Sequence, residues 1–195
     1  GTLVTTFKSA FTNENVKVWP EVQPYILREA MGVCYHEFTV PVNVGITGDD
    51  FELGQEDREA RLFMELLESE GAEIIASYDH YAWKKYAAIT RNTYGDGICY
   101  YLGCMTTANY LKALLTDILV EKGLWTWKQE YAFPLIIREG RNMAGKKVTY
   151  FLNYAKEPVS FICPVDGLEL TGMKKTAAGE KLEVEPWNLL IVEEN

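Results

Sequence analysis

The spacing of apolar residues changes near residue 124 of this 195-residue chain. Before that point, segments with helical spacing alternate with short apolar runs, which is typical of an α/β domain. After it, helical spacing disappears and short runs separated by turn residues follow one another, which indicates an all-β domain. We therefore predict two domains, residues 1–125 and residues 130–195, connected by the stretch that contains Trp125 and Trp127.

Three helices are predicted in the first domain. A short one over residues 24–31 would end at Gly32, and one from Thr106 or Thr107 to about Glu121 would begin at a threonine cap. The clearest pattern predicts a helix over residues 55–70, because four apolar side chains there recur close to helical spacing. These four residues are Leu62, Phe63, Leu66 and Leu67.

Short apolar runs rich in β-branched and aromatic residues predict the strands of the first domain. Residues 42–54 are glycine- and aspartate-rich and are expected to form a loop. The Asp-Gly pair at residues 96–97 predicts a hairpin. The strands are expected over residues 1–7, 33–40, 72–78, 86–91 and 98–102.

The second domain shows a period of two, with turn signals at regular intervals. In residues 148–154 one face would carry Val148, Tyr150, Leu152 and Tyr154, and the other Thr149, Phe151 and Asn153. One of these faces is expected to meet a core. Further alternation and a final apolar run, residues 187–192, complete the pattern of a small antiparallel β-sandwich.

Composition and charge narrow the classes of function. The chain carries 19 Lys and Arg against 28 Asp and Glu, a formal net charge of −9. Because a phosphate-binding protein needs a basic face, neither nucleic acid nor an anionic membrane is an expected partner. A (β/α)8 barrel of about 250 residues would not fit in this length.

The cysteines indicate a reduced protein. Cys34, Cys99, Cys104 and Cys163 are too sparse and too irregularly spaced for a disulfide scaffold, so we expect buried thiols. No secretory leader opens the chain, and a cytoplasmic location is expected.

No metal or cofactor is expected from the motifs. His36-Glu37 lacks the second histidine of a zinc helix, since Val40 stands in its place. The cluster of Asp49, Asp50 and Glu52 misses the calcium-loop pattern and is interpreted as a solvated acidic loop. The glycines at 95 and 97 lack the third glycine of a dinucleotide-binding loop. The many carboxylates single out no pair for glycoside hydrolysis.

Cys104 is the best candidate nucleophile, and it is a weak one. It follows Gly103 and precedes a predicted helix, and His80 beside Asp79 is the one plausible base. The next residue, Met105, is larger than a strand-to-helix nucleophile elbow tolerates. A cysteine hydrolase is therefore the least favoured alternative.

Aromatic residues make up 13% of the chain. They either fill cores or stack on sugar rings, and packing is the favoured interpretation because buried aromatics dominate core energetics. A carbohydrate-binding module that uses exposed Trp or Tyr of the β-sandwich stays open as an alternative. The tryptophans in question are Trp83, Trp125, Trp127 and Trp187.

The order of several segments resembles the middle domain of glycoside hydrolase family 42 β-galactosidases. Residues 151–154 and 157–159 of the all-β part resemble the small C-terminal domain of the same enzymes. No single motif is diagnostic, but the order and spacing of the motifs are together fairly specific. The resemblance covers nearly the whole chain. The segments in the first domain are residues 1–7, residues 24–33 with Glu37, residues 76–78, residues 87–97 and residues 100–103.

This resemblance implies a flavodoxin-like domain, similar in fold to class I glutamine amidotransferases and called the trimerisation domain, followed by a β-sandwich. In the family, both catalytic glutamates lie in an N-terminal (β/α)8 barrel, and no position here matches either of them. The resemblance thus implies no catalytic, cofactor-binding or metal-binding residues in this chain. It implies a non-catalytic role in homo-oligomer assembly and domain support, with the barrel of the same polypeptide as partner.

One departure from the family concerns the beginning of the α/β domain. Family members have one or two further strand-helix units before the strand at residues 1–7, so we expect an N-terminally truncated domain. The edge at Leu3-Val4 is then expected to be covered by a partner chain or a rearranged segment, or to stay exposed.

Overall fold

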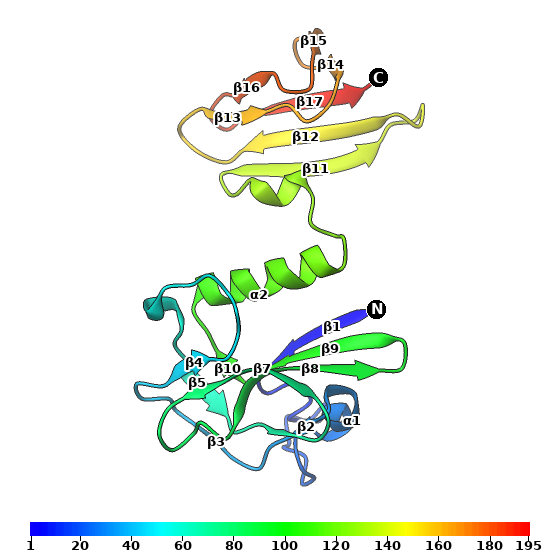
Figure 1. Cartoon of the computed structure of the whole chain (residues 1–195). Coiled ribbons are helices and arrows are strands. Elements are labelled where there is room, and N and C mark those ends of the chain that lie inside the picture. The colour runs from blue at the N-terminus through cyan, green and yellow to red at the C-terminus, as the bar shows by residue number, and fades with distance from the viewer. The chain divides into compact units, whose positions relative to one another are not determined.

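The computed structural model describes all residues, 1–195, and the chain divides into two compact units, Gly1–Ile118 and Leu119–Asn195 (Figure 1). No helix in the structure combines the length and the apolar character needed to span a bilayer. The last turn of α2 belongs to the second unit. The first unit contains β1 (Thr2–Thr6), η1 (Tyr25–Leu27), α1 (Arg28–Met31), β2 (Val33–Cys34), β3 (Phe38–Thr39), β4 (Gly45–Thr47), η2 (Gln55–Asp57), β5 (Arg61–Glu65), β6 (Glu68–Ser69), β7 (Glu73–Asp79), β8 (Ala87–Tyr94), β9 (Gly97–Leu102), β10 (Cys104–Met105) and most of α2 (Ala108–Glu121).

A five-stranded sheet in the order β1-β9-β8-β7-β4 organises the first unit. Only β1 and β9 run parallel, and the other three pairings are antiparallel. Two smaller sheets, β10-β5-β3 and β2-β6, complete the unit. This is a mostly stranded structure with few helices, and the flavodoxin-like description is not confirmed.

Both faces of the five-stranded sheet are covered, as β9 illustrates. Tyr100 and Leu102 pack in a cluster with α2, whereas Cys99 and Tyr101 pack in a second cluster with residues of α1 and β2. Figure 1 shows α2 on one side of the sheet and α1 on the other. Because successive side chains of a strand point to opposite faces, one strand contributes to both clusters.

Several predicted elements are confirmed. The hairpin between β8 and β9 pairs Tyr94 with Gly97 and places Gly95 at φ +54°, a conformation that glycine adopts without strain. Helix α2 is capped by Thr107, whose Oγ1 accepts a hydrogen bond from the Tyr110 N–H at 3.1 Å. Strand β1 lies within the predicted residues 1–7, and β7 closely matches residues 72–78.

Helix α1 ends at Gly32, as the sequence predicts, in the left-handed conformation at φ +61°. A Cβ at this position would lie 2.7 Å from the side chain of Asn92. Asn92 has little freedom to move, since its Nδ2 donates to the Ala30 carbonyl at 2.9 Å. Only glycine fits both the backbone conformation and the space.

Replacing Gly32 by alanine is therefore expected to destabilise the first unit by about 1–2 kcal/mol from the left-handed backbone, plus a further cost from the contact with Asn92. Gly95→Ala is the matched control, because Gly95 shares the positive φ and a Cβ added there would meet no atom within 4 Å. Urea denaturation of both variants measures the difference. Equal losses of unfolding free energy in the two variants would show that the contact with Asn92 adds nothing to the cost of the substitution.

The helix predicted over residues 55–70 is wrong. That segment forms a short η2, then β5 and β6, and Leu62 is 73% exposed. Leu66 and Leu67 are both buried but belong to the two clusters on opposite faces of the sheet, which only an extended chain allows. Pairing with β3 and β10 decides the structure, and these partners lie far away in the sequence.

Two further expectations need correction. The strand predicted over residues 33–40 is broken into β2 and β3, which pair with different partners, β6 and β5. The loop predicted over residues 42–54 contains β4, which pairs with β7 at the edge of the main sheet. Tertiary pairing again overrides local pattern.

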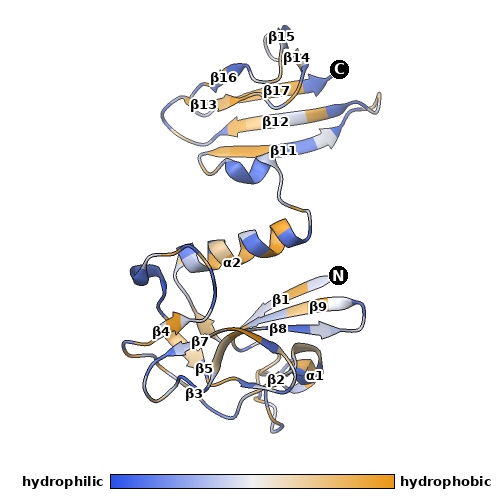
Figure 2. Cartoon of the chain, viewed as in Figure 1, coloured by the Kyte–Doolittle hydropathy of each residue, from blue (hydrophilic) through white to orange (hydrophobic).

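The second unit is built from antiparallel strands after a short η3. One sheet has the order β11-β12-β17-β14-β15, and β13 pairs with β16. In Figure 2, β11 is orange where it begins at Leu135 and turns blue along its length, which matches its change from buried to exposed residues. The elements are η3 (Trp127–Glu130), β11 (Leu135–Arg141), β12 (Lys147–Asn153), β13 (Val159–Ile162), β14 (Gly167–Glu169), β15 (Lys174–Thr176), β16 (Lys181–Val184) and β17 (Leu189–Glu194).

The core-facing side of β12 is the one that carries Thr149, Phe151 and Asn153. All three are essentially buried, whereas Tyr150 and Tyr154 on the opposite side are 38% and 47% exposed. Phe151 stacks on Phe161 of β13 with ring centroids 4.0 Å apart, which joins the two sheets. The other side is buried only in part: Val148 is 4% exposed and Leu152 is half-buried, so the main core contact of β12 is made by the side with fewer apolar residues, through the Phe151–Phe161 stack.

Candidate functional site

The surroundings of Cys104 are not those of a reactive thiol. It is 2% exposed in the cluster that faces α2, and burial raises the pKa of its thiol to about 12. His80 lies elsewhere: its Nδ1 accepts a hydrogen bond from the Ala82 N–H, and its ring contacts Tyr81 and Trp83. The structure does not bring Cys104 and His80 into contact. A buried thiol with a raised pKa and no histidine beside it lacks the features of a thiolate nucleophile.

The other cysteines match the expectation of buried thiols. All four are buried and none forms a disulfide. Burial also raises the pKa of the Cys34 thiol. No group of three or more histidine, cysteine, aspartate or glutamate side chains is arranged to hold a metal ion.

The acidic loop at residues 49–52 is not simply solvated, which corrects that interpretation for Asp49. The Asp49 side chain is fully buried and accepts hydrogen bonds from Arg58 at 2.9 Å and from the Tyr110 hydroxyl at 2.6 Å. Arg58 also donates to the Phe51 carbonyl at 2.6 Å. This network fastens the loop to α2, so Asp49 is a structural residue, while Asp50 is exposed.

Glu65 is a buried carboxyl that no sequence pattern singles out. It is 0% exposed, and it accepts hydrogen bonds from the Lys8 N–H at 2.9 Å and the Tyr101 hydroxyl at 2.8 Å. Burial raises the pKa of Glu65, and this effect outweighs the hydrogen bonds that favour its ionised form. Since the side chain is sealed from solvent, it could not reach a substrate, and we interpret it as part of the core.

The ammonium group of Lys8, whose backbone N–H donates to Glu65, lies in a cage of phenylalanines. Its Nζ is 3.6 Å from the ring centre of Phe11, 3.2 Å from that of Phe38 and 4.8 Å from that of Phe63. Desolvation by burial lowers the pKa of Lys8. Cation–π attraction compensates part of that desolvation, and it holds the segment after β1 against the β3–β5 pair.

A pH experiment tests the state of Glu65. A glutamate whose folded pKa lies above its unfolded value of about 4.3 loses its stabilising contribution as pH rises between the two values. The difference in unfolding free energy between wild type and Glu65→Gln is therefore expected to fall with rising pH in that window and to be constant below it. Chemical denaturation at a series of pH values measures this difference, and a difference that rises with pH would contradict the account.

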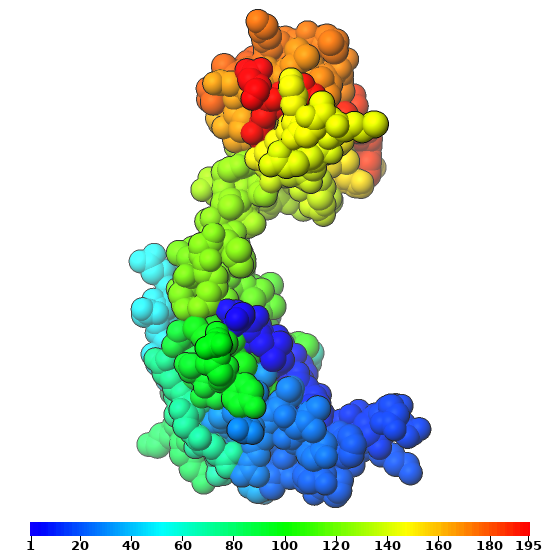
Figure 3. All heavy atoms as spheres, turned by 90° about the vertical axis from the view of Figure 1, so that its right-hand side faces the viewer, coloured from blue at the N-terminus to red at the C-terminus, as the bar shows by residue number.

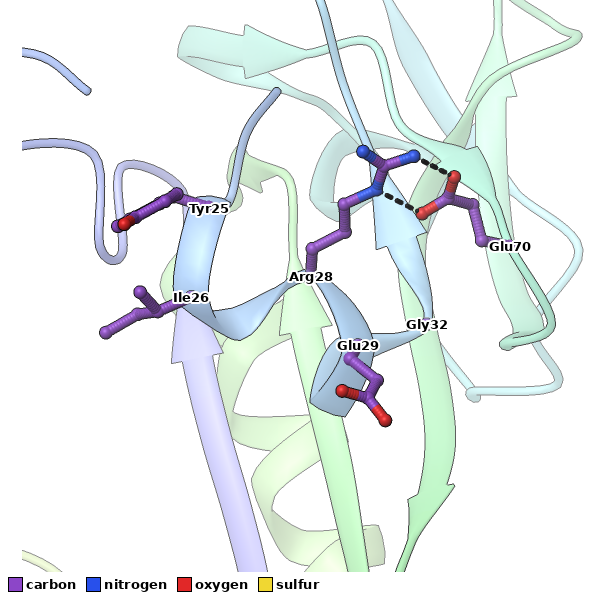
Figure 4. Close-up of a pocket in the computed structure, with 6 residues that line it drawn as sticks. All are labelled: Tyr25, Ile26, Arg28, Glu29, Gly32 and Glu70. Atoms are coloured by element: carbon purple, nitrogen blue, oxygen red, sulfur yellow. Dashed lines mark hydrogen bonds and ion pairs between the residues drawn. The ribbon is translucent and has the colours of Figure 1, made fainter. Parts of the chain in front are cut away.

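An open hollow lies on the surface of the first unit beside α1 (Figure 4). It has a volume of about 550 Å³. Arg28 and Glu70 form a two-pronged ion pair across it, which holds the pKa of the Glu70 carboxyl below its usual range, while Tyr25 and Ile26 point away from this pair (Figure 4). It is lined by Tyr25, Ile26, Arg28, Glu29, Gly32 and Glu70.

The chemistry of this hollow argues against catalysis. The charges of Arg28 and Glu70 neutralise one another, so this pair offers no site for an ion of either sign. The lining of the hollow contains no serine, threonine, cysteine, lysine or histidine side chain. The ion pair fastens α1 to the residue that follows β6 and has a structural role.

The edge of the main sheet is a more informative surface. Strand β1 is the last strand of that sheet and pairs only with β9, and Leu3 is 43% exposed. The space-filling view shows the first residues of the chain, in dark blue, at the surface of the first unit (Figure 3). No rearranged segment of this chain pairs with the free side of β1, so its backbone groups are available to a further strand.

The tryptophans divide into packed and exposed residues. Trp83 packs against the cluster below α2, and Trp127 contacts Phe151 with ring centroids 6.2 Å apart. Trp187 is 65% exposed and lies 6.3 Å from Tyr154, centroid to centroid. The favoured packing interpretation thus fits Trp83 and Trp127 and fails for Trp187.

Comparison with known proteins gives a consistent result. A sequence profile described as the β-galactosidase trimerisation domain matches residues 1–125. β-Galactosidase Pbg of Clostridium perfringens is 30% identical over 98% of the chain, and β-galactosidase BgaA of Clostridium cellulovorans is 29% identical over 99%. The chain spans 28% of the length of each of these relatives.

Solved structures agree in fold. The crystal structure of a β-galactosidase from Bacillus circulans sp. alkalophilus matches 100% of the chain with a TM-score of 0.83 at 23% sequence identity, over 29% of its own length. A cold-adapted β-galactosidase from Rahnella sp. R3 matches 99% of the chain with a TM-score of 0.77 at 20% identity. Both units are therefore present, in this order, in larger proteins.

Proposed function

The chain belongs to the β-galactosidase trimerisation domain family, and on that basis we propose that it serves the assembly of a longer β-galactosidase. The observation that carries this proposal is the match over residues 1–125, together with relatives that are several times longer than the chain. The reacting centre of the whole enzyme would then lie outside these residues. The parent protein would hydrolyse terminal β-galactosides, and this region would support its oligomer.

The residues described above favour a non-catalytic role. The best candidate nucleophile is buried with a raised pKa, the buried Glu65 is sealed, and the open hollow holds a neutralised ion pair. What the first unit does offer is an unpaired strand edge at β1. We assign assembly and domain support to residues 1–125, as a truncated flavodoxin-like domain, and to the β-sandwich at residues 130–195.

In this proposal the free side of β1 receives further strands of the complete domain. Strand addition would satisfy the backbone groups of β1 and cover Leu3, which is 43% exposed. A homo-oligomer, a trimer in the full-length protein, would then form from complete domains. The four free thiols agree with a reducing compartment, and we propose the cytoplasm.

An activity assay tests the non-catalytic part of the proposal. The 195-residue chain is expected to release no galactose or nitrophenol from lactose or a nitrophenyl β-galactoside, whereas the full-length protein hydrolyses both. Cys104→Ala should leave this result unchanged. Hydrolysis by the chain alone, abolished by Cys104→Ala or by substitution of a single carboxylate, would contradict the proposal.

One observation favours a second candidate function for the second unit, contact with carbohydrate. Trp187 and Tyr154 are neighbouring aromatic side chains and are 65% and 47% exposed. Exposed aromatic rings are suitable surfaces for sugar rings, which carry patches of C–H groups. This function would be compatible with assembly, since the two depend on different units.

A further inference from the structure

Trp187 occupies a turn position that glycine or asparagine normally takes. The turn runs over residues 185–188 and is closed by a hydrogen bond from the Asn188 N–H to the Glu185 carbonyl at 3.2 Å. Pro186 stands at its second position, and Trp187 at its third has a φ of +54°. Turns with proline second and a positive φ third require glycine or asparagine there. A bulky residue in this conformation costs about 1–2 kcal/mol.

Burial does not offset this strain. The Trp187 side chain is 65% exposed and is not part of the hydrophobic cluster of the second unit. Its ring contact is with Tyr154, 6.3 Å away between centroids at an interplanar angle of 66°, and Tyr154 is itself 47% exposed. Strain that packing does not explain is a reason to look for a function.

Buried Asn153 holds the two loops that carry these rings. Its Nδ2 donates to the carbonyls of Glu157 at 2.8 Å, Val184 at 3.0 Å and Glu185 at 3.1 Å, and its Oδ1 accepts from the Ala155 N–H at 2.9 Å. The loops are joined again by a hydrogen bond from the Trp187 N–H to the Ala155 carbonyl at 3.2 Å. The aromatic pair is therefore fixed before any ligand arrives, which lowers the entropic cost of binding.

The polar residues of the same two loops are suited to a neutral ligand. Lys156, Glu185 and Asn188 are exposed and offer a cation, a carboxylate and an amide within a few residues of the rings. All three groups can hydrogen-bond hydroxyls, and because exposed Glu157 lies next to Lys156, two carboxylates face one cation, which disfavours an anionic ligand. An aromatic corner bordered by such groups matches a sugar ring with one C–H-rich face and hydroxyls at its rim.

We propose that Trp187 and Tyr154 form a binding site for a neutral pyranoside, with a terminal β-galactosyl unit as the ligand to test first. This inference rests on the second function proposed above, not on assembly. The C–H face of the sugar stacks on the Trp187 indole, and the Tyr154 ring borders it at an angle. Lys156, Glu185 and Asn188 receive the hydroxyls.

Titration of the chain with lactose tests the proposal, with the indole N–H signals of the tryptophans followed by NMR and assigned through Trp187→Gly. The Trp187 signal is expected to shift in a saturable manner while those of the other four tryptophans do not. Trp187→Gly and Tyr154→Ala are expected to weaken binding by at least about tenfold. Tyr81→Ala is the matched control, because Tyr81 is 88% exposed on the other unit and should leave binding unchanged.

Stability measurements separate binding from packing. Because glycine relieves the strain at φ +54°, Trp187→Gly is expected to keep or raise the melting temperature. A lowered melting temperature together with unchanged lactose binding would show that Trp187 is a packing residue and would overturn the proposal. A Trp187 signal that does not move at saturating lactose would also overturn it. The assembly function is tested separately, by the oligomeric state of the full-length protein. Neither of these two results would bear on that oligomeric state.

Discussion

Replacing Asp49 by alanine is expected to lower the free energy of unfolding of the first unit by about 3–5 kcal/mol, because it leaves a buried guanidinium without its partner. The Asp49 side chain is fully buried, and that of its partner Arg58 is only 13% exposed. The same substitution removes the acceptor of the Tyr110 hydroxyl, 2.6 Å away on α2. The loop and the helix would lose their polar connection and keep only the ring contact between Phe51 and Tyr110.

Asp50→Ala provides the control for this prediction, since Asp50 is the exposed neighbour in the same loop. It is expected to change stability by no more than about 0.5 kcal/mol. Urea denaturation followed by circular dichroism compares the two variants. If Asp49→Ala costs less than about 1 kcal/mol, the pair behaves like a surface salt bridge and our description of the network is wrong.

Replacing Phe151 by alanine is expected to destabilise the second unit by about 3–5 kcal/mol. Phe151 is 0% exposed and stacks on Phe161 of the other sheet at 4.0 Å between centroids. It also contacts Trp127 of η3, so its removal opens a cavity at the meeting point of three elements. The first unit shares none of these contacts and should keep its stability.

Tyr150→Ala is the matched control for Phe151→Ala, because the two residues are adjacent aromatics on β12 with opposite burial. Because Tyr150 is 38% exposed, its replacement by alanine is expected to lower the free energy of unfolding much less. Hydrogen exchange measured for each unit separately would show accelerated exchange of the second unit in Phe151→Ala only. Similar losses of stability in the two variants would mean that both faces of β12 contribute equally to the core, which would contradict this description.

Local signals in the sequence were sufficient to predict those elements whose conformation depends only on neighbouring residues. The glycine after α1, the threonine cap of α2 and the Asp-Gly hairpin each follow from the conformational preferences of one or two residues. The resemblance, confirmed by the match over residues 1–125, depends on the order of such segments.

Long-range pairing could not be derived in this way. Residues 55–70 look helical by spacing, yet β5 pairs with β3 and β10, and the apolar neighbours Leu66 and Leu67 enter different cores. Burial of Asp49 and Glu65 was equally hidden, because their partners Tyr110 and Tyr101 are tens of residues away. The strained turn at Trp187 could have been noticed, since Pro186-Trp187 places a bulky side chain where a turn calls for glycine.

The native mass of the full-length protein shows whether this region assembles a larger enzyme. Sedimentation velocity would compare the intact protein with a version that lacks residues 1–118 and with one that lacks residues 119–195. We expect a trimer for the intact protein and a monomer once residues 1–118 are removed, with circular dichroism as the check on folding. A folded trimer that persists without residues 1–118 would contradict this expectation.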